Sequence, residues 1–183
     1  STTEVTDPAK DPLILVWDKP TTGQTFTFEE TLREVTGTTT QGTTTVVIKN
    51  TVRATSTLLM FVDRITGYVY GYIPDTGKTY QISNTVVPGV HDAYIFNNGK
   101  SILYRYTSDG DTPSIASLIA TIPHVLPTAQ AEPLGNTAYL PVQVTSVALS
   151  KNNRTISYLV PGDKGSTIYT LGEKGPETIA SSP

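Results

Sequence analysis

In residues 54–106, short strand-like stretches are separated by clusters of turn-forming residues. The strand-like stretches are either continuously apolar or alternate apolar with polar residues. The continuous apolar run at 57–62 has the length of a buried strand. Residues 68–73 alternate with a period of two, as a strand with two different faces does. Turn residues follow these strands at 63–67 and 74–78. The pattern predicts an antiparallel meander with tight turns.

A second hairpin is predicted at residues 90–106, where two strands flank an Asn-Gly turn at 97–100. Outside these two regions, strands are predicted at 12–17, 25–28, 43–49, 79–82, 141–149, 155–160 and 166–171. Residues 29–35 favour one helical turn, which is too short for a stable helix. The Thr- and Gly-rich stretch at 37–42 predicts a low-complexity loop.

Two segments in the second half of the chain have weaker patterns. Residues 114–122 fit either a strand or a short helix, and their position after a hairpin favours a strand. Residues 123–136 contain Pro, Ala and Gly with little periodicity, which predicts a loop.

Composition narrows the class of protein. The 183 residues suffice for one domain with a sizeable core or for two small ones. A net charge of -3 gives no reason to expect nucleic acid as a partner. The absence of cysteine excludes disulfides, thiolate zinc sites and cysteine nucleophiles. No apolar run approaches the roughly 18 residues of a membrane helix. A Thr-rich, Lys-poor, cysteine-free chain is typical of bacterial and archaeal surface proteins, so we expect an extracellular or cell-surface location.

The chain contains an internal repeat. Residues 90–106 align with residues 144–160, an offset of roughly 54 residues that is close to the period of propeller blades. The matched pairs are Asn98 with Asn152, Lys100 with Arg154, Ile102 with Ile156, and Tyr104 with Tyr158.

These repeats resemble the blade repeat of TolB-like and WD-type β-propellers, and residues 147–171 are the nearest copy. The segment from residue 64 to 106 also resembles segments of uncharacterised exported proteins of candidate-phyla (Patescibacteria-type) bacteria. The resemblance implies an all-β fold of antiparallel meanders forming propeller-like blades. Because propellers have typically 4–8 blades, it implies a partial or an oligomer-completed ring. A β-sandwich made from similar hairpins is the alternative.

The predicted organisation is an N-terminal arm with strands at 1–42, followed by blade-like repeats. The repeats are expected at about 43–86, 87–136 and 137–183, in one continuous domain. An open row of blades leaves edge strands to which partner chains add.

The candidate binding residues are aromatic. Tyr68, Tyr70 and Tyr72 share one face of a strand, and Trp17 is the only tryptophan. A row of tyrosines suits stacking on sugar rings or anchoring of a protein partner. Alternatively, these rings pack against a neighbouring sheet with their hydroxyls at its rim.

Other candidate sites carry weaker signals. Asp109 and Asp111 flank a glycine, as in part of a calcium loop, although a hairpin turn is the better interpretation. His91 and His124 are the only histidines and lack metal-site spacing. Asp63 follows a buried strand and favours an ion pair or a turn cap. No nucleophile elbow, phosphate loop or dinucleotide fingerprint is present, and no cofactor is expected.

The sequence therefore predicts a non-enzymatic structural or binding module that uses β-blades and edge strands for protein interaction. One alternative is a subunit of a self-assembling filament or surface layer, joined by strand addition through residues 11–17. Another alternative is a hydrolase on a propeller scaffold, because a fold alone does not exclude catalysis.

Overall fold

The computed structural model describes residues 15–41, 44–108, 114–140, 144–163, 165–172 and 175–181. These residues form three four-stranded sheets and no helix, so the predicted all-β class is confirmed. The first sheet comprises β1 (Thr21–Gln41), β2 (Thr44–Asp63), β3 (Val69–Ile73) and β4 (Lys78–Gln81). The second comprises β5 (Val90–Phe96), β6 (Ser101–Thr107), β7 (Ile115–Thr121) and β8 (Gly135–Tyr139). The third comprises β9 (Ser146–Leu149), β10 (Ile156–Gly162), β11 (Gly165–Gly172) and β12 (Gly175–Ser181).

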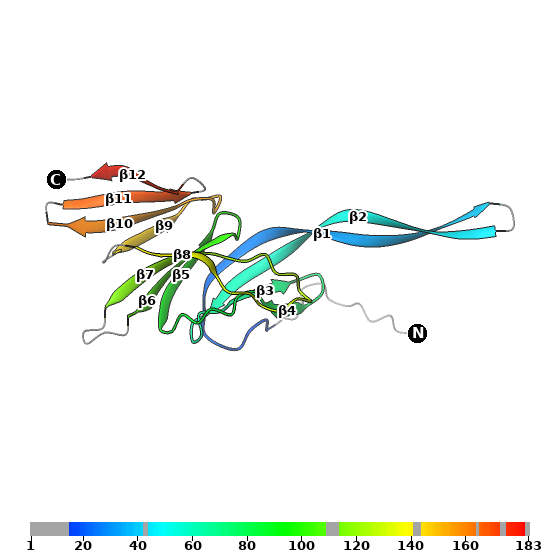
Figure 1. Ribbon diagram of the computed structural model, residues 1–183, viewed down its shortest axis with the longest axis horizontal. Coiled ribbons are helices and arrows are strands. Elements are labelled where there is room, and N and C mark those ends of the chain that lie inside the picture. Colours follow the sequence, from blue (N-terminus) through cyan, green and yellow to red (C-terminus); the bar gives the residue numbers. More distant parts are fainter. Residues whose placement is uncertain are drawn as a thin grey trace, which may run out of the picture.

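Each sheet is an antiparallel meander whose strands pair in chain order. Figure 1 shows the three sheets in succession, from β1–β4 through β5–β8 to β9–β12. None of the sheets closes on itself among the described residues. Each sheet therefore begins and ends with an edge strand.

The first two strands are much longer than the rest. Their pairing runs from Thr21 opposite Asp63 to Gln41 opposite Thr44. β3 joins β2 only along residues 59–62, so the remainder leaves the body as a two-stranded ribbon (Figure 1). We call residues 28–41 and 44–57 the ribbon, a length of about 40 Å at roughly 3.3 Å per residue.

The ribbon corrects two expectations. The predicted helical turn at 29–35 is wrong, because these residues pair in register with 50–56. The predicted loop at 37–42 is also wrong up to Gln41, which is the last residue of β1. One turn of helix makes few hydrogen bonds, whereas a long partner strand satisfies a backbone group at every second residue.

Two further expectations differ from the structure. The predicted strand at 12–17 is absent at 15–17, and its earlier residues lie outside the described chain. The predicted loop at 123–136 ends in β8, which pairs with β7. The strand favoured for 114–122 is confirmed as β7.

The core lies between the sheets in two clusters. The larger one joins the first and second sheets, and the smaller one joins the second and third. β6 serves both, because its alternating side chains point to opposite faces. Ile102 and Tyr104 belong to the larger cluster, and Leu103 between them belongs to the smaller one. The second sheet is thus the middle layer of the molecule.

Candidate functional site

The predicted aromatic residues lie on the face of the first sheet that points away from the larger core. Phe61 and Tyr70 are partners across β2 and β3, which places their rings together at 5.8 Å between centroids. Trp17 packs on both, 4.4 Å from the Tyr70 ring and 5.4 Å from the Phe61 ring. Lys19 Nζ lies 5.5 Å from the Trp17 ring centroid. The chain's own N-terminal segment therefore covers this part of the face.

The three tyrosines differ in exposure. Tyr72 is buried, whereas Tyr68 and Tyr70 are half-buried. The pKa of the Tyr70 hydroxyl is raised, mainly because the group is partly buried and, to a smaller extent, because Asp63 and Tyr68 lie nearby. The rings of Tyr70 and Tyr72 are thus largely used in packing within the chain.

The aromatic face continues onto β1 with exposed rings. Register places Phe26 opposite Leu59, and Leu59 opposite Tyr72. Phe26 is 67% exposed and Phe28, two residues further on the same face, is 75% exposed. Sequence analysis did not select these phenylalanines, because alternation in 25–28 indicates a strand and not which of its faces is covered.

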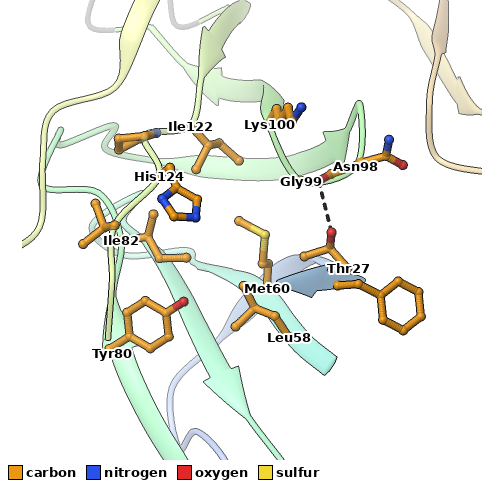
Figure 2. A pocket seen from close by; sticks show the side chains of 13 residues that line it. Thr27, Leu58, Met60, Tyr80, Ile82, Asn98, Gly99, Lys100, Ile122 and His124 are labelled. Carbon is orange, nitrogen blue, oxygen red and sulfur yellow. Dashed lines mark hydrogen bonds between the residues drawn. The ribbon is translucent and has the colours of Figure 1, made fainter. Parts of the chain in front are cut away.

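A cavity of about 220 Å³ opens between the first two sheets (Figure 2). It is lined by Thr27, Phe28, Leu58, Met60, Tyr80, Ile82, Asn98, Gly99, Lys100, Ile122, Pro123, His124 and Val125. In Figure 2, Met60, Ile122 and His124 are directed into the same space from three different segments. Leu58, Met60, Ile82, Ile122 and Val125 are all buried apolar residues. The cavity therefore has an apolar floor and a polar rim.

A second, more polar crevice of about 340 Å³ lies on the other side of the Asn97–Lys100 turn, along β1. It is lined by residues 25–28 of β1, Asn98, Gly99, Asn152 and Asn153. Asn153 Nδ2 donates a hydrogen bond to Thr25 Oγ1 at 3.0 Å, and Thr27 Oγ1 donates to the Asn98 carbonyl at 3.1 Å. The turns of two different sheets thus meet on one strand.

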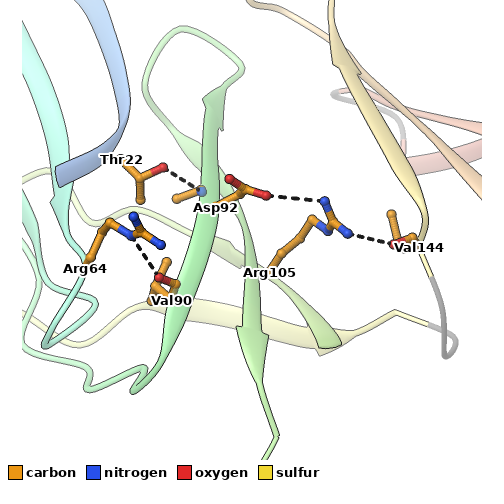
Figure 3. A network of polar contacts seen from close by, with 7 residues as sticks. Thr22, Arg64, Val90, Asp92, Arg105 and Val144 are labelled. Atoms are coloured by element: carbon orange, nitrogen blue, oxygen red, sulfur yellow. Dashed lines mark hydrogen bonds and ion pairs between the residues drawn. The ribbon is translucent and has the colours of Figure 1, made fainter. Parts of the chain in front are cut away.

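A polar network ties β5 to its neighbours (Figure 3). Arg105 pairs with Asp92 at 3.3 Å and donates through Nη2 to the Val144 carbonyl at 3.2 Å. Arg64 Nε donates to the Val90 carbonyl at 3.2 Å, and the amide of Ala93 donates to Thr22 Oγ1 at 3.3 Å. The Arg105–Asp92 pair lies within the second sheet, and the other three bonds join that sheet to residues beside or in the first and third sheets, so the network helps to hold the sheets together.

The remaining titratable candidates are separated in space or lie outside the described residues. Asp63 caps its turn by accepting hydrogen bonds from the amides of Ile65 and Thr66, at 2.8 and 3.1 Å. His91 Nε2 shares a hydrogen bond with Thr107 Oγ1 at 2.8 Å. Among the described residues, no three His, Asp or Glu side chains gather as a metal site. Asp109 and Asp111, the calcium candidates, fall within the part of the chain that is not described.

Comparison of the chain with protein-family models, curated proteins and solved structures found no match. In the described part of the chain, no helix is long and apolar enough to cross a membrane.

Proposed function

We propose that this chain is an exported, non-enzymatic interaction module that binds other proteins by strand addition to its ribbon. The observation that carries the proposal is the open backbone of β1 and β2 beyond Phe28 and Thr57. No third strand among the described residues pairs with either edge there. Unpaired amides and carbonyls along a long, regular edge are a template for another strand.

The outer end of the ribbon lacks the devices that usually protect an edge, whereas its base carries charged residues such as Glu34 and Lys49. Residues 37–48 contain no charged residue and no proline. They are rich in Thr, Val and Ile, which favour strands. Proteins that keep their edges free place Lys, Pro or bulges on them. A two-stranded ribbon is only marginally stable by itself. Its unprotected end therefore supports a role in pairing with a strand of another chain.

We further infer that the three sheets are propeller-like blades. Each has four antiparallel strands in meander order, which is the strand order within a blade. The two copies of the repeat form β5–β6 and β9–β10, the first two strands of their sheets. Ile102 and Ile156, which are matched in the repeat, are both completely buried. A row of three such blades leaves its outer sheets open to further blades or to partners.

The experiment compares the intact chain with a variant in which Asn-Gly replaces residues 32–53. Thr31 and Ala54 are register partners, so a two-residue turn can join them without disturbing the body. Light scattering on a sizing column gives the mass, and a labelled peptide of residues 44–57 serves as the added strand. We expect the intact chain to self-associate or to bind the peptide, and the shortened variant to do neither. A ribbon that neither associates nor binds the peptide would overturn the proposal.

A second variant tests the ribbon without removing it. Lysine at both Thr39 and Val47 adds charge to the uncharged end, and Thr79→Lys on exposed β4 is the matched control. We expect the double variant to lose association and the control to retain it. Large species that depend on protein concentration would favour the filament alternative, in which the partner is a second copy.

A further inference from the structure

We propose that the apolar cavity between the first two sheets binds a medium-chain aliphatic carboxylate. Its chain would lie against Met60, Ile82 and Ile122, and its carboxylate beside Lys100. The proposal is independent of the ribbon, because these three apolar residues come from the body.

The size of the cavity defines the apolar part of the ligand. Its volume is about 220 Å³. Engineered apolar cavities of about 150 Å³ stay dry and take up benzene. The cavity therefore has room for a chain of about eight carbons. Met60 and Ile82 are each 3% exposed and Ile122 is 6% exposed, so the floor of the cavity is formed by side chains that the core already holds in place.

The charge at the rim defines the head group. Lys100 is the one permanently charged residue among those lining the cavity, and no Asp or Glu lines it. In a chain of net charge -3, this is a local preference for an anion. A single carboxylate on an apolar chain matches both parts of the cavity.

The backbone of Lys100 is held in place on both sides. Its amide donates a hydrogen bond to the Asn97 carbonyl at 3.1 Å, and its carbonyl accepts one from the Ile122 amide at 2.9 Å. Gly99 packs so closely that a Cβ there would lie 2.9 Å from Met60 Sδ. These contacts fix the wall before any ligand arrives, as in most small-molecule sites.

The sole methionine of the chain gives a direct readout, because Met60 lies in the cavity floor. A sample labelled with ¹³C at the methionine methyl shows one side-chain signal. We expect octanoate to shift this signal in a saturable titration, and octylamine, its cationic analogue, to bind more weakly. No shift with octanoate would overturn the proposal, as would equal affinities for the two ligands.

Charge reversal at the rim tests the role of Lys100. We expect Lys100→Glu to weaken octanoate binding at least about threefold and to strengthen octylamine binding. Lys78→Glu is the matched control, since Lys78 is also an exposed lysine but lies on β4 and does not line the cavity. Equal effects of the two substitutions would show that only net charge matters and would overturn the assignment to Lys100.

Discussion

Tyr104 shows how one buried hydroxyl group joins two sheets. The residue is completely buried on β6, and its hydroxyl donates a hydrogen bond to the Gly67 carbonyl at 2.8 Å. Gly67 has a φ of 76° and lies against the backbone of Val87, so its position tolerates no side chain. Burial raises the pKa of Tyr104 far above its ordinary value of 10.0. Its hydroxyl therefore stays protonated in the folded chain.

Replacing Tyr104 with Phe should lower the free energy of unfolding by about 1–2 kcal/mol at pH 8, because the Gly67 carbonyl loses its donor. The raised pKa means that the stability contributed by Tyr104 is complete below about pH 10 and decreases above it, since the unfolded chain loses this proton first. The difference between the two proteins should therefore shrink by pH 11.

Urea unfolding at both pH values, followed by Trp17 fluorescence, measures this difference. Tyr139→Phe is the control, because Tyr139 is 75% exposed. An unchanged difference between pH 8 and pH 11 would contradict this account of Tyr104.

At the scale of elements, sequence patterns located the hairpins better than the ribbon. The turns at 63–67, 74–78 and 97–100 were predicted, because Gly and Asn at left-handed positions are local signals. The ribbon was divided into short strands, one helical turn and a loop. No further strand among the described residues pairs with the outer part of these two strands, so no core there imposes an alternation of apolar and polar residues. Their pairing becomes visible only in the register between distant segments.

For the candidate sites too, local sequence patterns were informative and contacts between distant segments were not predictable. Alternation alone correctly placed Tyr70 and Tyr72 on one face. The cavity was not predictable, because Met60, Lys100 and Ile122 come from separate segments that only tertiary packing brings together. In the sequence, Lys100 is simply the end of a turn.

Two glycines in turns allow the effect of close packing to be separated from backbone strain. Gly99 and Gly77 both have a positive φ, of 82° and 65°. Alanine at either position adopts a strained conformation that costs about 1–2 kcal/mol. At Gly99 its Cβ also meets Met60 and Thr27, whereas nothing lies within 4 Å at Gly77. We expect Gly99→Ala to reduce the unfolding free energy more than Gly77→Ala does. Equal losses in parallel urea titrations would refute the importance of this contact.

At the scale of the molecule, the middle sheet couples the other two. Its β6 contributes to both core clusters, and Arg105 on the same strand reaches the Val144 carbonyl, just before the third sheet. Asn153 extends from the third sheet's first turn to Thr25 on the first sheet. These links predict that the body unfolds as one cooperative unit.

A destabilising substitution in the third sheet should therefore also lower the stability of the first sheet. Ile156 is completely buried on β10, and Ile156→Ala should cost about 2–5 kcal/mol. We expect the unfolding midpoint seen by Trp17, which packs on the first sheet, to decrease together with that of the whole chain. Leu149→Ala, at a residue 38% exposed, is the control and should have a smaller effect. A normal Trp17 transition beside a separate, earlier one would show that the sheets unfold independently.

The length of the ribbon has an electrostatic consequence. Its outer end lies about 40 Å from the body, several times the Debye length of about 8 Å at physiological ionic strength. Even the nearest carboxylate, that of Glu34 on the ribbon itself, lies seven residues before Gln41, about 23 Å at roughly 3.3 Å per residue. The carboxylates therefore exert only a weak field at that end. A partner approaching the tip meets a neutral surface, so its rate of association should vary little with salt concentration or with the partner's own charge.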